Sequence, residues 1–184
     1  MHFKDYIFIL TLFTILLLAI LYPTSKPEFL EVSIDVKETC TPNVVESEYE
    51  LFLDAIGHQE SGNRYNIVNR YGYMGRYQFG RTTLKTLKIK TTRQEFLNDT
   101  FLQEYAMHKH LLYNKKRLNK YINKYEGQVV NNILITESGL LAAAHLCGAG
   151  SVRKWFRTGK VAEDGNGVKI TSYMRRFGGY DLSL

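Results

Sequence analysis

The sequence predicts a mainly α domain with one small irregular β region, preceded by an N-terminal membrane helix. Apolar residues recur at helical spacing along most of the chain after residue 47. Capping residues or glycines stand where these periodic stretches begin and end. An uncharged apolar run over 6–22 predicts the membrane helix. A chain of 184 residues can bury one core of ordinary size.

The N-terminal part divides into an anchor over 1–22 and a linker over 23–46. The run 6–22 contains 17 residues without charge, and its only internal polar breaks are Thr11 and Thr14. It is short for a membrane span but longer than the usual apolar part of a signal peptide, and no small-x-small cleavage pattern follows it. We therefore predict an uncleaved signal-anchor or transmembrane helix, with a cleaved secretion signal as the alternative. Prolines at 23, 27 and 42 and scattered acids predict a flexible linker.

The predicted domain occupies 47–184 and begins with a helix. Ser47 and Glu50 have capping-box spacing, and an apolar stripe follows at helical spacing as far as about Glu60. Gly62 suits the end of that helix. The segment 63–80 has no helical period, and its glycines predict turns and the small irregular β region.

The remainder of the domain is expected to be helical. Thr92 and Glu95 form a second capping-box pattern, which opens a helical stretch that extends to about residue 105. The helical pattern resumes over 111–125 and stops at Gly127. Further helices are expected over 136–147, 151–158 and 171–177.

Charge is unevenly distributed along the chain. Residues 28–60 carry nine acids against one base, whereas residues 61–184 carry 21 Lys and Arg against eight Asp and Glu. Such a basic surface suits an anionic polymer, either nucleic acid or a bacterial wall with its peptide carboxylates and teichoic phosphates. Because the N-terminal segment predicts export, nucleic acid is the poorer candidate. A solvated basic face is the alternative.

Cysteine and histidine patterns favour neither a disulfide framework nor a metal site. The chain has two cysteines, of which we interpret Cys147 as a small buried residue, with a Cys40–Cys147 bridge as the alternative. The histidines form no His-x-x-x-His pattern and the cysteines no Cys-x-x-Cys pattern. We therefore predict no metal site and no cofactor.

Glu60 is the candidate catalytic residue. It lies near the end of its predicted helix, and residues 61–94 contain no Asp or Glu. The negative end of the helix dipole and burial against aromatic rings would both favour the protonated carboxyl, as general acid catalysis requires. The alternative is that Glu60 pairs with Arg64 or Arg70.

Three separated segments together resemble the lytic transglycosylase branch of the lysozyme-like superfamily. Glu60-Ser61-Gly62 matches the Glu-Ser-Gly motif of that family, and Gly75-Arg76-Tyr77-Gln78 matches its Gly-x-x-Gln segment. Residues 144–152 align with its third motif, Ala-Tyr-Asn-Ala-Gly-x-Gly-x-Val. The resemblance covers about residues 47–158. The C-terminal tail is similar to that of transglycosylase-like proteins whose third motif is Ala-Ala-His-Leu.

The resemblance implies a lysozyme-like α+β fold and cleavage of peptidoglycan between N-acetylmuramic acid (MurNAc) and N-acetylglucosamine (GlcNAc). Glu60 would protonate the bridging oxygen, and the acetamido group of the substrate would stabilise the cationic centre. Glu60 would then act as the base for the C6 hydroxyl, which gives 1,6-anhydromuramic ends without water. The expected substrate-binding residues are Ser61, Tyr65, Tyr73, Tyr77, Gln78 and His145.

Two departures from the family pattern bear on this expectation. His145 stands where the family usually has a tyrosine that hydrogen-bonds the catalytic Glu, and Leu146 replaces an asparagine. A histidine can make the same bond, whereas a core histidine is the alternative. For the tyrosines, the alternative is that several simply build the core beneath the segment 63–80.

Two further functions remain as alternatives. A hydrolytic muramidase on the same fold would need a second acid, from Glu137, Glu163 or Asp164, to activate water. A catalytically inactive wall-binding or assembly module would be consistent with the departures at His145 and Leu146. The absence of acids over 61–94 favours the single-acid route.

The expected partners are peptidoglycan glycan strands, the membrane through the N-terminal helix, and a cell-envelope machine, with no nucleic acid. The expected location is the bacterial cell envelope. There the anchor would lie in the inner membrane and the catalytic domain in the periplasm, or the domain would be secreted if the N-terminal segment is cleaved.

Overall fold

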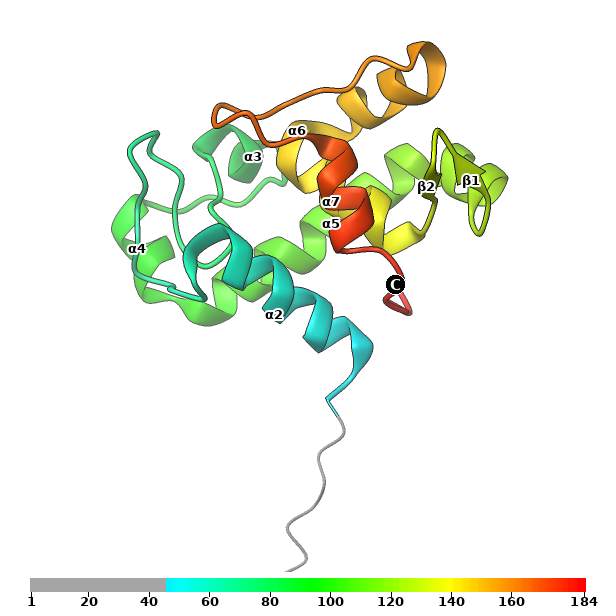
Figure 1. The fold of residues 1–184 in the computed structure, drawn as a ribbon. Helices are drawn as coiled ribbons and strands as arrows, with labels where there is room; N and C mark the ends of the chain where they lie inside the picture. Colours follow the sequence, from blue (N-terminus) through cyan, green and yellow to red (C-terminus); the bar gives the residue numbers. More distant parts are fainter. Residues whose placement is uncertain (1–45) are drawn as a thin grey trace, which may run out of the picture. The chain divides into compact units, whose positions relative to one another are not determined.

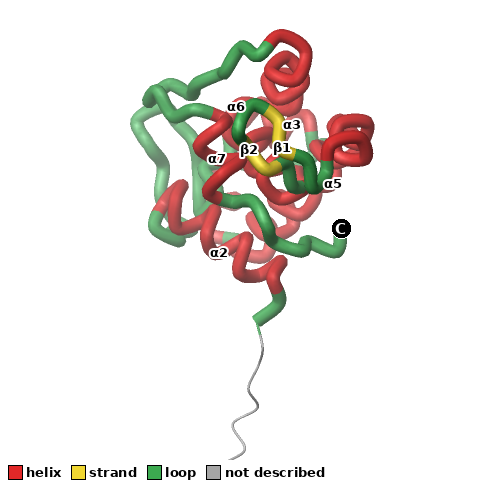
Figure 2. The backbone as a smooth tube through the Cα atoms, turned by 45° about the vertical axis from the view of Figure 1, so that its right-hand side comes forward, coloured by secondary structure: helices red, strands yellow, loops and turns green. Residues whose placement is uncertain are grey.

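The computed structural model describes residues 46–184, which are mainly helical (Figures 1 and 2). This confirms the predicted mainly α class. The predicted membrane helix and most of the linker lie outside the described residues, and no helix within 46–184 is long and apolar enough to cross a membrane. The elements are α2 (Glu48–Ser61), α3 (Arg81–Thr86), α4 (Arg93–Asn98), α5 (Thr100–Tyr125), β1 (Val129–Val130), β2 (Ile133–Leu134), α6 (Glu137–Thr158) and α7 (Ile170–Arg176).

Helix α2 begins and ends where its sequence predicts. The Ser47 hydroxyl accepts a hydrogen bond from the backbone N–H of Glu50 at 3.2 Å, and the Glu50 carboxylate accepts one from the backbone N–H of Ser47 at 3.0 Å. Gly62 ends the helix in the left-handed conformation, with φ 64°. The helix buries Phe52 and Ile56 and places Glu60 in its last turn.

The second capping box is also confirmed, but the helix that it opens is short. Helix α4 ends at Asn98, and Asp99 then caps α5 by accepting a hydrogen bond from the backbone N–H of Leu102 at 2.8 Å. Helix α5 continues without interruption for 26 residues. The predicted break between residues 105 and 111 is therefore wrong. The helical face continues there through buried Ala106, Met107 and His110.

The small β structure differs from the prediction. Strands β1 and β2 pair antiparallel, with Val129 opposite Leu134, in a segment for which the sequence had given no prediction. Asn131 and Asn132 join them with φ of 48° and 60°, as a two-residue hairpin turn of the primed type requires. The segment 63–80, where the β region was expected, contains turns and isolated bridges only.

Helix α6 passes through the middle of the domain and packs against α5 and α7 (Figure 1). Its first half is buried from Ser138 to Ala144. It bends at Gly148, where φ 78° and ψ 152° are not helical, so the two helices predicted over 136–147 and 151–158 meet at this residue. The close approach to α7 requires a glycine at 139, because a Cβ there would lie 2.6 Å from the carbonyl oxygen of Met174.

Helix α3 was not predicted. It is short, and Leu84 is its only buried residue, so it has no apolar stripe to reveal it in the sequence. It follows directly on Gln78-Phe79-Gly80 and forms one wall of the site described next.

Candidate active site

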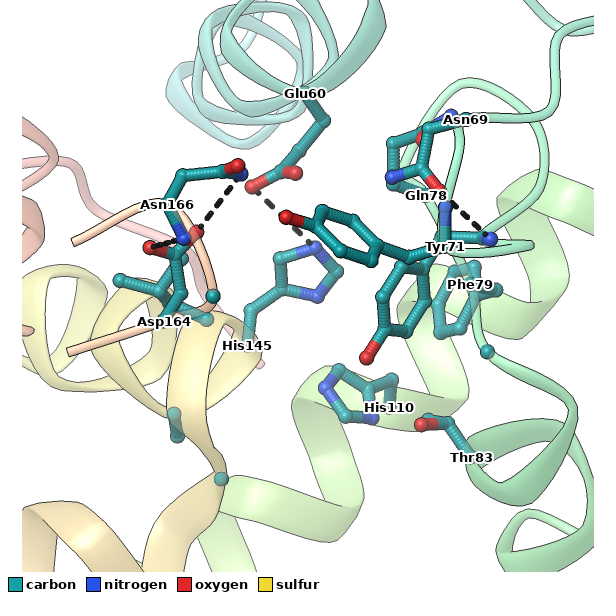
Figure 3. Close-up of a pocket in the computed structure, with 16 residues that line it drawn as sticks. Glu60, Asn69, Tyr71, Gln78, Phe79, Thr83, His110, His145, Asp164 and Asn166 are labelled. Carbon is teal, nitrogen blue, oxygen red and sulfur yellow. Dashed lines mark hydrogen bonds and ion pairs between the residues drawn. The ribbon is translucent and has the colours of Figure 1, made fainter. Parts of the chain in front are cut away.

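A cleft of about 360 Å³ lies between α2, α6 and the loops that follow α2 and α6 (Figure 3). Glu60 enters it from α2 and His145 from α6, and the two side chains point toward one another. The loop 69–80 lies on one side of them and Asp164 and Asn166 on the other. The lining residues are Glu60, Asn69, Tyr71, Tyr73, Gln78, Phe79, Gly80, Thr83, His110, Ala144, His145, Leu146, Gly148, Asp164, Gly165 and Asn166.

Glu60 is held by a tyrosine from a distant part of the chain. The Tyr173 hydroxyl, on α7, donates a hydrogen bond to Glu60 Oε1 at 2.7 Å. Burial and the Glu60 carboxylate both raise the pKa of Tyr173 above its usual value, so this phenol stays protonated and remains a donor at neutral pH. Tyr173 lies in a predicted helix, 171–177, but was not among the expected site residues. The tyrosine hydroxyl that the resemblance would place at position 145 therefore comes from α7.

His145 is the second group beside Glu60. Its Nε2 lies 3.9 Å from Glu60 Oε1, and its side chain is only 8% exposed. Burial lowers the pKa of His145, against the opposing influence of the Glu60 carboxylate and the Tyr77 carbonyl. The ring packs edge-to-face on Phe79. A neutral imidazole therefore lies next to the carboxyl group.

His110, on α5, packs against His145 and was not expected from the sequence. Its ring packs against His145, with centroids 5.3 Å apart, and its Nε2 lies 2.9 Å from Asn114 Nδ2. Burial and the neighbouring His145 lower the pKa of His110 to about 3. Both rings are thus kept uncharged in the wall of the cleft.

Ser61, which was expected to bind substrate, is not among the residues that line the cleft. The Ser61 hydroxyl donates to the Arg76 carbonyl at 2.8 Å and accepts from the Arg64 backbone N–H at 2.9 Å. Ser61 is buried. It therefore fastens the end of α2 to the Gly75–Gln78 segment and positions both.

Gln78 lies in the cleft as expected. Its φ of 52° is unusual for a residue other than glycine, and its Nε2 donates to the Gly75 carbonyl at 2.8 Å. Gly75 itself has φ 75°, and a Cβ there would lie 2.0 Å from Gln103 Oε1. The tight turn formed by these residues orients the Gln78 amide, whose oxygen accepts no hydrogen bond from residues 46–184.

The three expected tyrosines separate into two groups. Tyr73 lines the cleft and is 45% exposed. Tyr77 is fully buried, and its hydroxyl donates to Glu104 Oε2 at 2.6 Å. The Tyr65 hydroxyl donates to Glu104 Oε1 at 2.7 Å. The fully buried Tyr77 therefore supports the loop from beneath, whereas Tyr65 is partly exposed, and neither residue is among those that line the cleft.

Tyr71 is a lining residue that the sequence analysis missed. It is 51% exposed, and the guanidinium of Arg70 lies 4.7 Å from its ring centroid. Together with Tyr73 it presents exposed aromatic surface at the cleft. Its place in the segment 63–80 was the available signal, since three other tyrosines of that segment, Tyr65, Tyr73 and Tyr77, are expected site residues.

Of the three acids considered as a second carboxylate, only Asp164 lines the cleft. Asp164 Oδ1 accepts hydrogen bonds from the backbone N–H groups of Asn166 at 2.9 Å and Val168 at 2.7 Å. Glu137 instead pairs with Lys115 at 2.9 Å on another surface. Glu163 faces Lys169 at 3.8 Å and is 47% exposed. Asp164 is thus the one structural candidate, and it is already engaged in a turn.

No group of three or more His, Cys, Asp or Glu side chains within 46–184 is arranged to bind a metal ion. Cys147 is partly buried, and Cys40 lies outside the described residues. Comparison of the chain with models of known protein families, with curated proteins and with solved structures gives no match.

Proposed function

We propose that this chain is a peptidoglycan lytic transglycosylase that cleaves the MurNAc–GlcNAc bond with Glu60 as its single acid and base. The observation that carries the proposal is the carboxyl group of Glu60, hydrogen-bonded by Tyr173 and next to an uncharged His145 in an aromatic-lined cleft. A proton donor for a glycosidic bond needs a fixed orientation and an environment that does not stabilise its anion through a nearby cation. The Tyr173 hydroxyl fixes the orientation of Glu60, and no Lys or Arg of residues 46–184 lies within 4.0 Å of its carboxyl oxygens.

The two oxygens of Glu60 would have different tasks. Oε1 accepts the Tyr173 hydroxyl, whereas Oε2 takes no hydrogen bond from residues 46–184. Oε2 would therefore hold the proton that passes to the bridging oxygen as the glycosidic bond breaks. The same oxygen would then remove the proton from the C6 hydroxyl of MurNAc as the 1,6-anhydro bond forms.

The loop 69–80 would bind the sugars. The free amide oxygen of Gln78 can accept a hydrogen bond from an acetamido N–H. Tyr71 and Tyr73 offer exposed rings on which pyranose faces can pack. Such a combination of exposed aromatic rings and a few oriented amides is typical of small polar ligand sites.

A hydrolytic muramidase is the second candidate, because Asp164 lines the same cleft as Glu60. In that mechanism Asp164 would activate the attacking water. Its Oδ1 already accepts two backbone hydrogen bonds that shape the loop, so we favour a structural role. A binding module without catalysis is the third candidate, and we disfavour it because the cleft retains an oriented carboxyl group.

We further propose the setting that follows from this chemistry. The N-terminal apolar run would anchor the protein in the inner membrane, or direct its secretion if cleaved, and place the domain at peptidoglycan in the cell envelope. A cell-envelope machine that must open the wall locally would be a suitable partner.

Mass spectrometry of the soluble products distinguishes the candidates. The full-length protein in detergent is incubated with purified peptidoglycan, beside Glu60→Gln and Asp164→Asn variants. We expect anhydro-muropeptides from the wild type and from Asp164→Asn, and none from Glu60→Gln. Reducing-end products that disappear in Asp164→Asn would establish the hydrolase instead. No products from a folded wild type that still binds peptidoglycan would favour the binding module.

A further inference from the structure

A basic groove lies on the other side of α3 from the cleft. Met74, Leu84 and Ile89 contribute its apolar surface, and Arg81, Lys85, Lys88, Lys90 and Arg93 contribute five cations. Residues 81–94 contain no Asp or Glu. None of the five cations lies within 4.0 Å of a carboxylate of residues 46–184. Uncompensated cations of this density favour an anionic ligand.

One of these lysines occupies a backbone position that glycine favours. Lys88 has φ 58° and follows the end of α3, where its N–H donates to the Lys85 carbonyl and the N–H of Ile89 donates to the Leu84 carbonyl. This is the Schellman pattern, in which the left-handed residue is usually Gly. A lysine at this position has a conformational cost, and no ion pair with a carboxylate of residues 46–184 offsets it. A ligand for its ammonium group would explain it.

Helix α3 forms a wall shared by the groove and the cleft. Thr83 and the preceding Gly80 line the cleft, whereas Arg81, Leu84 and Lys85 line the groove. A helix with its side chains is about 10–12 Å across. An extended peptide spans about 3.3–3.6 Å per residue, so three to five residues attached to a sugar in the cleft reach the groove.

We propose that this groove binds the acidic stem peptide attached to the glycan strand. This inference builds on the proposed function, because it takes a peptidoglycan strand as the ligand of the cleft. The peptide carboxylates would pair with Lys85, Lys88 and Lys90, and its alkyl side chains would cover Leu84 and Ile89. The enzyme would then distinguish peptide-bearing strands from strands whose peptides have been removed.

The test measures binding separately from cleavage. Full-length Glu60→Gln protein is co-sedimented with insoluble peptidoglycan freed of other anionic wall polymers, before and after an amidase removes the stem peptides. We expect removal of the peptides to weaken binding about tenfold. Each exposed charge contact contributes modestly, so three lysines are replaced together. Adding K85Q/K88Q/K90Q to Glu60→Gln should weaken binding to peptidoglycan with stem peptides by a similar factor and leave binding to peptidoglycan without them unchanged.

Two matched variants separate charge from fold. K116Q/K120Q/K160Q removes the same charge from three other exposed lysines and should bind like the parent. Lys88→Gly should raise the thermal unfolding temperature, because it relieves the left-handed backbone, yet weaken binding about twofold to threefold. Stability and binding are therefore expected to change in opposite directions in this variant: stability rises and binding weakens.

The outcomes distinguish this inference from the proposed function. If K85Q/K88Q/K90Q binds intact and stripped peptidoglycan as its parent does, the groove does not bind the stem peptide, whatever the cleavage assay gives. If the triple variant loses binding only to preparations that keep phosphate-rich wall polymers, the inference is also overturned. If peptide-dependent binding holds while the wild type releases no products, the inference survives and the proposed catalysis fails.

Discussion

At the scale of single residues, the site depends on one hydrogen bond between α2 and α7. Tyr173→Phe removes the hydroxyl that Glu60 Oε1 accepts but retains the buried ring. A hydrogen bond to a charged group contributes about 1.5–3 kcal/mol, so we expect kcat to fall by about 10- to 100-fold with little change in KM. Product release from purified peptidoglycan measures this. Tyr180→Phe is the control, because no hydrogen bond of its hydroxyl is present within 46–184, and full activity of Tyr173→Phe would remove Tyr173 from the site.

A second residue-scale prediction concerns Glu104, which accepts hydrogen bonds from Tyr65, Tyr77 and Arg76. Glu104→Ala leaves the fully buried Tyr77 hydroxyl and the Arg76 guanidinium without this partner. We expect the free energy of unfolding to fall by about 2–4 kcal/mol, measured by urea denaturation. Glu163→Ala also removes one partner of an ion pair, but an exposed one, and should cost less than about 1 kcal/mol. Equal losses from the two variants would contradict a supporting role for Glu104.

These residues mark what the sequence could and could not predict about the site. Glu60, Gln78 and Tyr73 stand in local motifs, and the structure places all three in the cleft. Tyr173 lies 113 residues after Glu60, and their hydrogen bond depends on how α7 packs on α6. The sequence does not say which ring of a tyrosine-rich loop faces inward, and the structure buries that of Tyr77.

At the scale of elements, capping residues predicted where helices begin better than the apolar pattern predicted where a helix continues. The capping boxes at Ser47 and Thr92 act as predicted, because each is completed within four residues. The break predicted within α5 failed because the buried polar residue His110 occupies a core position that a hydrophobic pattern omits. The hairpin over 129–134 carried a signal that was missed, namely two asparagines between two short apolar pairs.

The bend in α6 gives a prediction with a matched control. Gly148 lines the cleft and has φ 78° and ψ 152°, a combination that is essentially restricted to glycine. Gly148→Ala should lower the free energy of unfolding by about 1–3 kcal/mol, although no atom lies within 4 Å of the added Cβ. Gly150 has the same open space but helical backbone, so Gly150→Ala should stabilise by about 0.5–1 kcal/mol.

Urea denaturation of both variants measures these changes. Because neither methyl group meets another atom, a steric clash cannot explain a difference between them. Opposite signs would show that the left-handed backbone at the bend, and not the added methyl group as such, determines the change in stability. A neutral Gly148→Ala would mean that the bend can relax without cost.

At the scale of the whole molecule, the positive charges around α3 lie on the surface and the cleft histidines lie in the core. The exposed cations of residues 81–93 lie outside the core, whereas the imidazoles of His110 and His145 are enclosed by it. The sequence predicted the net basic character of residues 61–184 from composition alone. It could not predict that two histidines, 35 residues apart in sequence, would share one buried cluster, because that depends on the packing of α5 against α6.

The buried imidazoles make folding stability depend on pH. Burial lowers the pKa of His110 to about 3, while the unfolded chain retains a value of about 6.5. Above pH 6.5 His110 is neutral in both the folded and the unfolded state, so its full contribution to folding stability is present. Below pH 6.5 the unfolded state binds the proton and the folded state does not, so stability falls as the pH falls toward 3. The limiting slope is about 1.4 kcal/mol per pH unit for one histidine.

We therefore expect the free energy of unfolding to decrease between pH 7 and pH 5.5, a range above the usual titration of carboxylates. His110→Gln should show a shallower decrease, because one of the two groups with a lowered pKa is gone, even if the variant is less stable at every pH. His58→Gln, which removes an exposed histidine, is the matched variant for the loss of one histidine. Urea denaturation at several pH values measures the slopes. Equal slopes for the wild type and His110→Gln would mean that His110 takes up its proton in the folded state, so that the wall of the cleft carries a charge.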